Sequence, residues 1–95
     1  MLNDNKINSL SELFKIFSDP TRLKIINILL NEEKCVSDIS NILNISQSAI
    51  SHQLKILKTS KLVKYTKKGK EVYYSLFDNR VQKIFELVGE HINEI

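Results

Sequence analysis

Apolar residues recur every three or four positions over most of the chain, which is the spacing of one face of an α-helix. The pattern predicts helices over residues 7–17, 20–30, 37–43 and 47–58, and a last helix that follows Asp78. The second helix is apolar nearly all round, so we expect it to be the central buried helix. In the third and fourth helices, the residues expected to face inward are Ile39, Ile42, Leu43, Ala49, Ile50, Leu54 and Leu57.

Local signals mark where several of these helices begin. Asp19 is placed to cap the second helix, with Pro20 at its first position, where the missing N–H costs nothing. Asn44 tolerates the left-handed backbone of a tight turn, and Ser46 is placed to cap the helix that follows. The third and fourth helices therefore read as a helix-turn-helix.

Two β-prone runs, residues 62–66 and 71–76, follow the fourth helix. Residues 67–70 join them and contain Gly69, which predicts a hairpin with three lysines and no acid in its connection. Residues 31–34 are expected to form only a polar connection. The predicted fold is mainly α with a small β-hairpin, in a single domain over residues 1–95.

The first and last helices carry more apolar surface than one small domain needs. Asp78 is placed to cap the last helix, whose apolar face comes after the core is already accounted for. That face comprises Val81, Ile84, Phe85, Val88, Ile92 and Ile95. A chain of 95 residues buries a limited core, and many such domains gain core by dimerising. The pattern therefore favours a dimer through the first and last helices.

Charge is segregated along the chain. Between Ile39 and Lys70 there are seven lysines and no acid, so this third of the protein carries about +7. The remainder has seven basic and eleven acidic residues, a net charge of −4. A positive field over one surface attracts a polyanion. On a helix-turn-helix followed by a hairpin, it indicates duplex DNA, with a merely solvated lysine face as the simpler reading.

The outer face of helix 47–58 combines amide, hydroxyl, imidazole and ammonium groups without any glutamate. These groups suit base edges and phosphates. We expect this helix to enter the major groove, with Gln47, Ser48, Ser51 and His52 nearest the bases. The side chains expected on phosphates are Lys55, Lys67, Lys68 and Lys70.

Several other classes of protein are disfavoured. No Gly-rich phosphate loop, paired-carboxylate cleft or redox motif is present, and His52 has no nearby acid to orient it, so an enzyme is not expected. No apolar run is long enough to span a bilayer, and because the first residues are polar we expect no signal peptide. Cys35 is the only cysteine, which fits a reducing cytoplasm. A winged helix that binds other proteins is the remaining alternative class.

Three segments resemble the ArsR/SmtB family of bacterial metal-sensing repressors. They are the Ser-Asp-Pro-Thr-Arg start within residues 14–26, the Ser-x-Ser-x-x-Ser-His helix within residues 46–58, and the Tyr-Tyr-Ser-Leu strand within residues 69–76. They occur in the family's order and spacing, and the resemblance covers about residues 8–95. It implies a winged helix-turn-helix homodimer, paired through its first and last helices, that represses an operator until an inducer releases it.

The resemblance also implies where an inducing metal would bind. One family site uses Cys-Val-Cys-Asp at the start of the third helix. This chain has Ser37 where the second thiolate would be, so a soft-metal site is not expected there. The other family site lies across the paired last helices, and its positions here are Asp78, Arg80, His91 and Glu94.

Asp78, His91 and Glu94 could hold zinc with water as a fourth ligand, but Arg80 places a positive charge where a ligand is needed. Two alternatives therefore stay open. In one, zinc at Asp78, His91 and Glu94 releases the operator. In the other, the regulator is independent of metal, and Arg80 makes an ion pair with an acid of the partner chain instead.

Overall fold

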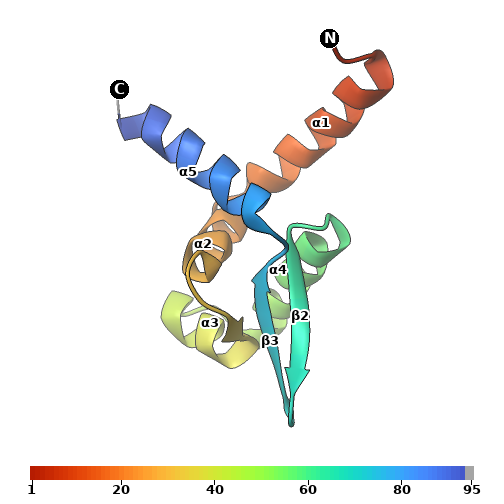
Figure 1. Ribbon diagram of the computed structural model, residues 1–95. Coiled ribbons are helices and arrows are strands. Elements are labelled where there is room, and N and C mark those ends of the chain that lie inside the picture. Colours follow the sequence, from red (N-terminus) through yellow and green to blue (C-terminus); the bar gives the residue numbers. More distant parts are fainter. Residues whose placement is uncertain (94–95) are drawn as a thin grey trace.

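The computed structural model describes residues 1–93 and comprises five helices and a three-stranded sheet (Figure 1). The helices are α1 (Asp4–Phe17), α2 (Pro20–Leu29), α3 (Val36–Leu43), α4 (Gln47–Thr59) and α5 (Asn79–Asn93). The strands are β1 (Lys34–Cys35), β2 (Val63–Lys68) and β3 (Glu71–Leu76). The predicted mainly helical fold with a hairpin, a winged helix-turn-helix, is confirmed.

The predicted helix starts and the interhelical turn are present. The Asp19 carboxylate accepts a hydrogen bond from the backbone N–H of Arg22 at 3.0 Å, with Pro20 at the first helical position. Asn44 ends α3 in the left-handed conformation, at φ 55°. Ser46 Oγ then accepts from the N–H of Ala49 at 3.2 Å and caps α4. These features depend only on residues close together in the sequence, so the sequence pattern was enough to predict them.

The connection predicted over residues 31–34 is wrong at its end, because Lys34 and Cys35 form a short strand. This strand pairs antiparallel with β3, placing Lys34 opposite Tyr74 and Cys35 opposite Tyr73, so β3 is the central strand of the sheet. Two residues are too few to show alternation. Only the pairing with a distant strand makes them β.

The hairpin is tighter than predicted. β2 continues to Lys68, which lies opposite Glu71, so only Gly69 and Lys70 form the turn. Gly69 has φ 63°, the left-handed backbone that a two-residue turn requires and that glycine adopts without a steric penalty. The three lysines of the predicted connection are therefore divided between a strand and a turn.

The core lies between α2, α3, α4 and the base of the hairpin. Its buried side chains are Ile25, Ile26, Leu29, Ile39, Ile50, Leu54, Leu57, Leu62, Val63 and Val81. The central position predicted for α2 is confirmed by three of them. Ile42 and Ala49 do not face inward as predicted, since both are exposed. The buried stripe of α4 follows Ile50, Leu54 and Leu57, and Ala49 lies beyond its edge.

Helices α1 and α5 extend from the same end of the body, opposite the tip of the hairpin (Figure 1). No residue of α1 is buried, and in α5 only Val81 is. Their exposed large apolar side chains are Ile7, Leu10, Phe14, Ile84, Leu87, Val88 and Ile92. Over residues 1–93, no helix is long and apolar enough to cross a membrane.

Candidate nucleic-acid interface

Helix α4 is held to the core along one side and is open to solvent along the other. The buried side chains of Ile50, Leu54 and Leu57 fix its inner face. On the outer side, all five residues assigned to bases or phosphates on this helix are exposed. They are Gln47, Ser48, Ser51, His52 and Lys55. Ser48, His52 and Lys55 follow one another at helical spacing, so they form a single ridge.

The hydroxyl of Ser48 is partly engaged within the protein. Its Oγ lies 3.3 Å from Ser46 Oγ, the group that caps α4. Gln47, Ser51 and His52 make no side-chain hydrogen bond within residues 1–93, so their polar atoms are available to another molecule. The outer face of α4, with Gln47 and Ser51 beside the ridge, therefore offers amide, hydroxyl and imidazole groups together with the Lys55 ammonium, as base edges and phosphates require.

The β2–β3 hairpin, called the wing below, presents Lys67, Lys68 and Lys70 at its outer end, and all three are exposed. Lys68 is engaged, because its ammonium forms an ion pair with Glu33 from the loop between α2 and β1. It also lies 5.4 Å from the ring centroid of Tyr73. An acid therefore reaches this lysine group from a part of the chain that lies outside the acid-free window.

A second contact attaches the wing to α4. The Lys58 ammonium lies 4.3 Å from the ring centroid of Tyr65 on β2, and Tyr65 faces Tyr74 with ring centroids 6.0 Å apart. A cation over an aromatic face is attracted by the ring quadrupole. Lys58, in the last turn of α4, thus connects that helix to the wing.

Asp78 and Arg80 form a closed pair at the start of α5. Asp78 Oδ1 accepts from the backbone N–H of Arg80 at 2.9 Å, which confirms Asp78 as a helix cap. Asp78 Oδ2 accepts from the Arg80 guanidinium, at 2.6 Å from Nη2 and 3.0 Å from Nε. This ion pair is made within one chain, whereas one of the two alternatives from the sequence has Arg80 paired with an acid of the partner chain.

The pair changes the acid strength of both groups. The hydrogen bonds from Arg80 lower the pKa of the Asp78 carboxyl below its usual range, and the same contact raises the pKa of Arg80. A carboxylate with a lowered pKa contributes its stabilisation above its ordinary pKa and loses it only as the pH falls through the lower folded value. At neutral pH, Asp78 is therefore ionised and engaged by Arg80.

The other positions implied for zinc lie apart from Asp78 in a single chain. His91 is exposed on the last turn of α5, about 20 Å along the helix from Asp78 at 1.5 Å per residue. Glu94 lies outside the described residues. Within residues 1–93, no three ligating side chains gather at one point. A zinc site at these positions would need two chains and the release of Asp78 from Arg80.

Cys35 does not fit a soft-metal site. It is buried, and its Sγ lies 3.1 Å from Ser37 Oγ, the position where the family site would supply a second thiolate. A hydroxyl is a poor ligand for a soft metal, and Cys35 is the only thiol of the chain. Cys35 packs as a small apolar residue where β1 meets α3.

Comparisons with known proteins agree with this geometry. Residues 19–65 match the bacterial regulatory protein family arsR. The chain is 40% identical over 90 residues to a protein of Synechocystis named as a transcriptional repressor SmtB homolog, covering 95% of this chain and 68% of that one. It is 43% identical over 86 residues to a cadmium resistance regulator, a CadC homolog of Staphylococcus aureus, covering 90% of this chain and 71% of that one.

Among solved structures, the homodimeric winged helix-turn-helix DNA-binding domain of Mb0332 from Mycobacterium bovis superimposes with a TM-score of 0.88. It is 25% identical, and the match covers 99% of this chain and 90% of that one. The match to the family extends from the cap of α2 into β2 and so includes the whole helix-turn-helix. The chain therefore belongs to the arsR family of bacterial regulatory proteins.

Proposed function

We propose that the protein is a sequence-specific repressor that binds operator DNA as a two-fold homodimer. The observation that carries this proposal is the outer ridge of α4. It is exposed, lies within a window that has no acid, and presents groups able to hydrogen-bond base edges. Solvated helices normally carry glutamate among their lysines, whereas phosphates repel a carboxylate on a helix that approaches them closely.

In this proposal α4 lies in the major groove, with Gln47, Ser48, Ser51 and His52 directed at base pairs. Lys55 and the wing lysines Lys67, Lys68 and Lys70 lie on phosphates. Phosphate contacts orient the protein without reading sequence, and base contacts supply the discrimination. The contact between Lys58 and Tyr65 supports this arrangement, because it links α4 directly to the wing.

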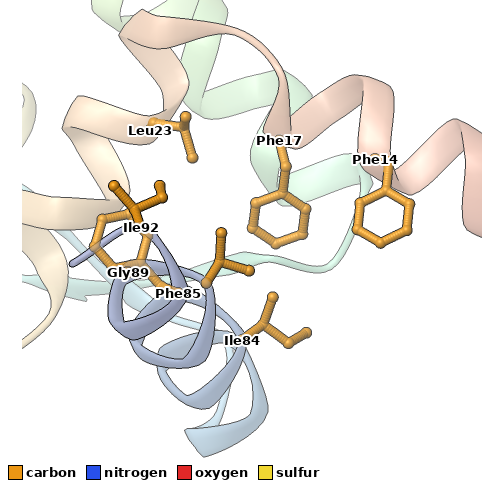
Figure 2. A pocket seen from close by; sticks show the side chains of 8 residues that line it. Phe14, Phe17, Leu23, Ile84, Phe85, Gly89 and Ile92 are labelled. Carbon is orange, nitrogen blue, oxygen red and sulfur yellow. The ribbon is translucent and has the colours of Figure 1, made fainter. Parts of the chain in front are cut away.

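The proposed dimer forms through α1 and α5. Between these helices and α2 lies an open apolar groove of about 320 Å³, lined by Phe14, Phe17, Leu23, Ile84, Phe85, Val88, Gly89 and Ile92. Figure 2 shows the side chains of α1 and α5 directed into the space between the two helices. A second copy carries the same two apolar faces and can cover both by two-fold symmetry.

Such a dimer would place its two α4 helices about one DNA turn apart, roughly 34 Å. The expected operator is therefore an imperfect palindrome. The test is selection of duplexes from a random pool by the purified protein, followed by fluorescence anisotropy on the selected and scrambled sequences. Recovery of no preferred duplex, or equal affinity for both sequences, would contradict the proposal.

Changes at the wing should act on all DNA sequences alike. Lys68→Ala is expected to weaken binding to selected and scrambled duplexes equally and to reduce the slope of log K against log salt by about 0.9. Glu33→Gln should act in the opposite direction, because it releases the Lys68 ammonium for a phosphate. Anisotropy titrations between low and moderate salt measure both slopes.

Lys83→Ala provides the control for these wing variants. Lys83 is exposed on α5, and its replacement removes the same charge. Helix α5 extends from the end of the molecule opposite the wing tip (Figure 1). A drop in slope as large for Lys83→Ala as for Lys68→Ala would mean that net charge, and not the wing, is responsible.

The second candidate function is a repressor released by zinc, with the metal held by Asp78 of one chain and His91 and Glu94 of the other. The closed pair between Asp78 and Arg80 instead favours a metal-independent regulator. Arg80→His should tighten zinc binding by about tenfold or more, since even the partners of metal ligands change affinity by that much. Arg80→Ala is the control, because it frees Asp78 without adding an imidazole.

Calorimetry with zinc, alongside operator binding with and without the metal, separates the two regulators. Micromolar zinc binding that weakens operator binding would establish the zinc-released repressor, and the coupling would be reciprocal. Normal operator binding by a wild-type protein that takes up no zinc at micromolar concentration would establish the metal-independent one.

A further inference from the structure

Arg22 connects three helices through a single guanidinium group. It is the third residue of α2, and its backbone N–H is held by the cap residue Asp19 at 3.0 Å. Its Nε donates to the backbone oxygen of Ile16 in α1 at 2.8 Å, and its Nη1 donates to Oε1 of Gln53 in α4 at 3.1 Å. We call this set of contacts the Arg22 bridge.

On the α1 side, the bridge satisfies backbone groups at the end of the helix. The last carbonyls of an α-helix have no partner within it. Arg22 Nε binds the oxygen of Ile16, and Nη2 approaches the oxygen of Lys15 at 3.5 Å. The direction of the last turn of α1 is therefore tied to the rigid start of α2.

On the α4 side, the bridge reaches the residue next to the proposed reader His52. Gln53 is half-buried between exposed His52 and buried Leu54, so its amide lies beside the outer ridge and not on it. An arginine fork has a fixed geometry, which restricts its acceptors in direction as well as distance. The bridge thus constrains the rotation of α4 at the level of the reading residues.

Leu13 and Ile16 of α1 pack against the edge of the core, but apolar packing between α1 and α4 is incomplete. Ile16 of α1 faces His52 and Ile56 across an open hollow of about 420 Å³. A second hollow of about 310 Å³ separates Leu13 and Ile16 from Ser60 at the end of α4. Close packing resists displacement, but open hollows do not. The polar contacts of the bridge span the region that packing leaves loose.

We infer that Arg22 is a positioning residue that sets the direction of α4 relative to α1. Through the proposed dimer, it thereby sets the spacing of half-sites that the protein accepts. The effect on half-site spacing rests on the proposed function. The effect on the direction of α4 rests only on contacts within one chain. Arg22 itself needs no contact with a base or a phosphate in this role.

Two variants that leave the net charge unchanged distinguish positioning of α4 by Arg22 from mere capping of the end of α1. Gln53→Leu removes only the α4 side of the bridge and leaves the bonds to Lys15 and Ile16 intact. Arg22→Lys keeps the positive charge but loses the fork. Asn27→Leu is the matched control, because it makes the same amide-to-aliphatic change at an exposed position of α2.

The DNA experiment measures affinity for three duplexes. The first is a palindromic duplex selected by the wild-type protein, the second is the same duplex with one base pair inserted between its half-sites, and the third is an isolated half-site. Both bridge variants should bind the selected duplex about five- to tenfold more weakly, the scale of one or two lost hydrogen bonds. Their preference for the selected spacing over the inserted one should shrink by a similar factor. Half-site affinity should stay at the wild-type level.

A distance measurement tests the bridge without DNA. Spin labels are placed at Asn8→Cys on α1 and Lys55→Cys on α4, in a Cys35→Ser background, and the labelled chain is mixed with excess unlabelled protein. Pulsed electron resonance should give a narrow distance distribution for the otherwise wild-type chain and for Asn27→Leu. Gln53→Leu and Arg22→Lys should give a broader or displaced distribution. Gln53→Glu, which keeps the acceptor, should restore the narrow one.

The outcomes distinguish the inference from the proposed function. Unchanged distances and spacing preference in both bridge variants would overturn the inference. A change in Arg22→Lys alone would also overturn it, because Arg22 would then only cap α1. If the wild-type protein selects no duplex but the bridge variants broaden the distances, the proposed function fails and the structural role of Arg22 stands.

Discussion

Replacing Val88 with aspartate is expected to convert the proposed dimer into monomers and to abolish tight operator binding. Val88 lines the apolar groove between α1 and α5 and is 52% exposed in the single chain. A carboxylate there would have to be buried without a partner when a second copy covers the groove, which is unfavourable. The loss of bivalent binding should weaken operator affinity by about a hundredfold or more.

Sedimentation velocity and anisotropy measure the two consequences of Val88→Asp. Because Val88 belongs to no buried cluster of the single chain, the variant should keep its circular dichroism spectrum. Lys83→Gln is the control, since it also lowers the net charge by one on the exposed side of α5. A wild-type protein that sediments as a monomer at micromolar concentration would remove the basis for the dimer.

Replacing Gln47 and His52 together with alanine is expected to remove most of the preference for the operator over other duplexes. Each hydrogen-bonded contact to a base edge is worth roughly 1–3 kcal/mol of discrimination, so the double variant should lose about a hundredfold in specificity. Binding to scrambled DNA should change little, because Lys55 and the wing lysines remain. The ratio of the two affinities at one salt concentration is the measurement.

Thr59→Ala serves as the control, because Thr59 is exposed at the far end of the same helix. Both variants should unfold near the wild-type temperature, since none of the three positions is buried. If the Gln47/His52 variant discriminates between duplexes as the wild-type protein does, α4 is not the helix that reads sequence.

Most of the fold and the proposed reading surface follow from short-range patterns. Several features depend only on residues within a few positions of one another. They are the buried face of each helix, the helix caps Asp19 and Ser46, the turn at Asn44 and the hairpin turn at Gly69. The exposed ridge of α4 follows from the same rule, because the buried stripe fixes which residues lie opposite. Sequence alone therefore located the residues proposed to contact DNA.

The short-range pattern wrongly predicts burial for two residues at the edge of the buried face of their helices. Ile42 and Ala49 fit an inward stripe by spacing, yet both are exposed. The width of a buried stripe depends on how closely the neighbouring elements approach, and periodicity alone does not contain that information. Ala49 consequently lies near the proposed reading ridge and not in the core.

Contacts between distant parts of the chain were decided only by the tertiary structure. Strand β1 exists because Lys34 and Cys35 meet β3, and Lys68 loses its freedom because the loop before β1 brings Glu33 to the wing. The link from Arg22 to Gln53 spans 31 positions. A pair at such separation leaves no periodic signal, since its geometry arises only when packing of the apolar faces brings the helices together.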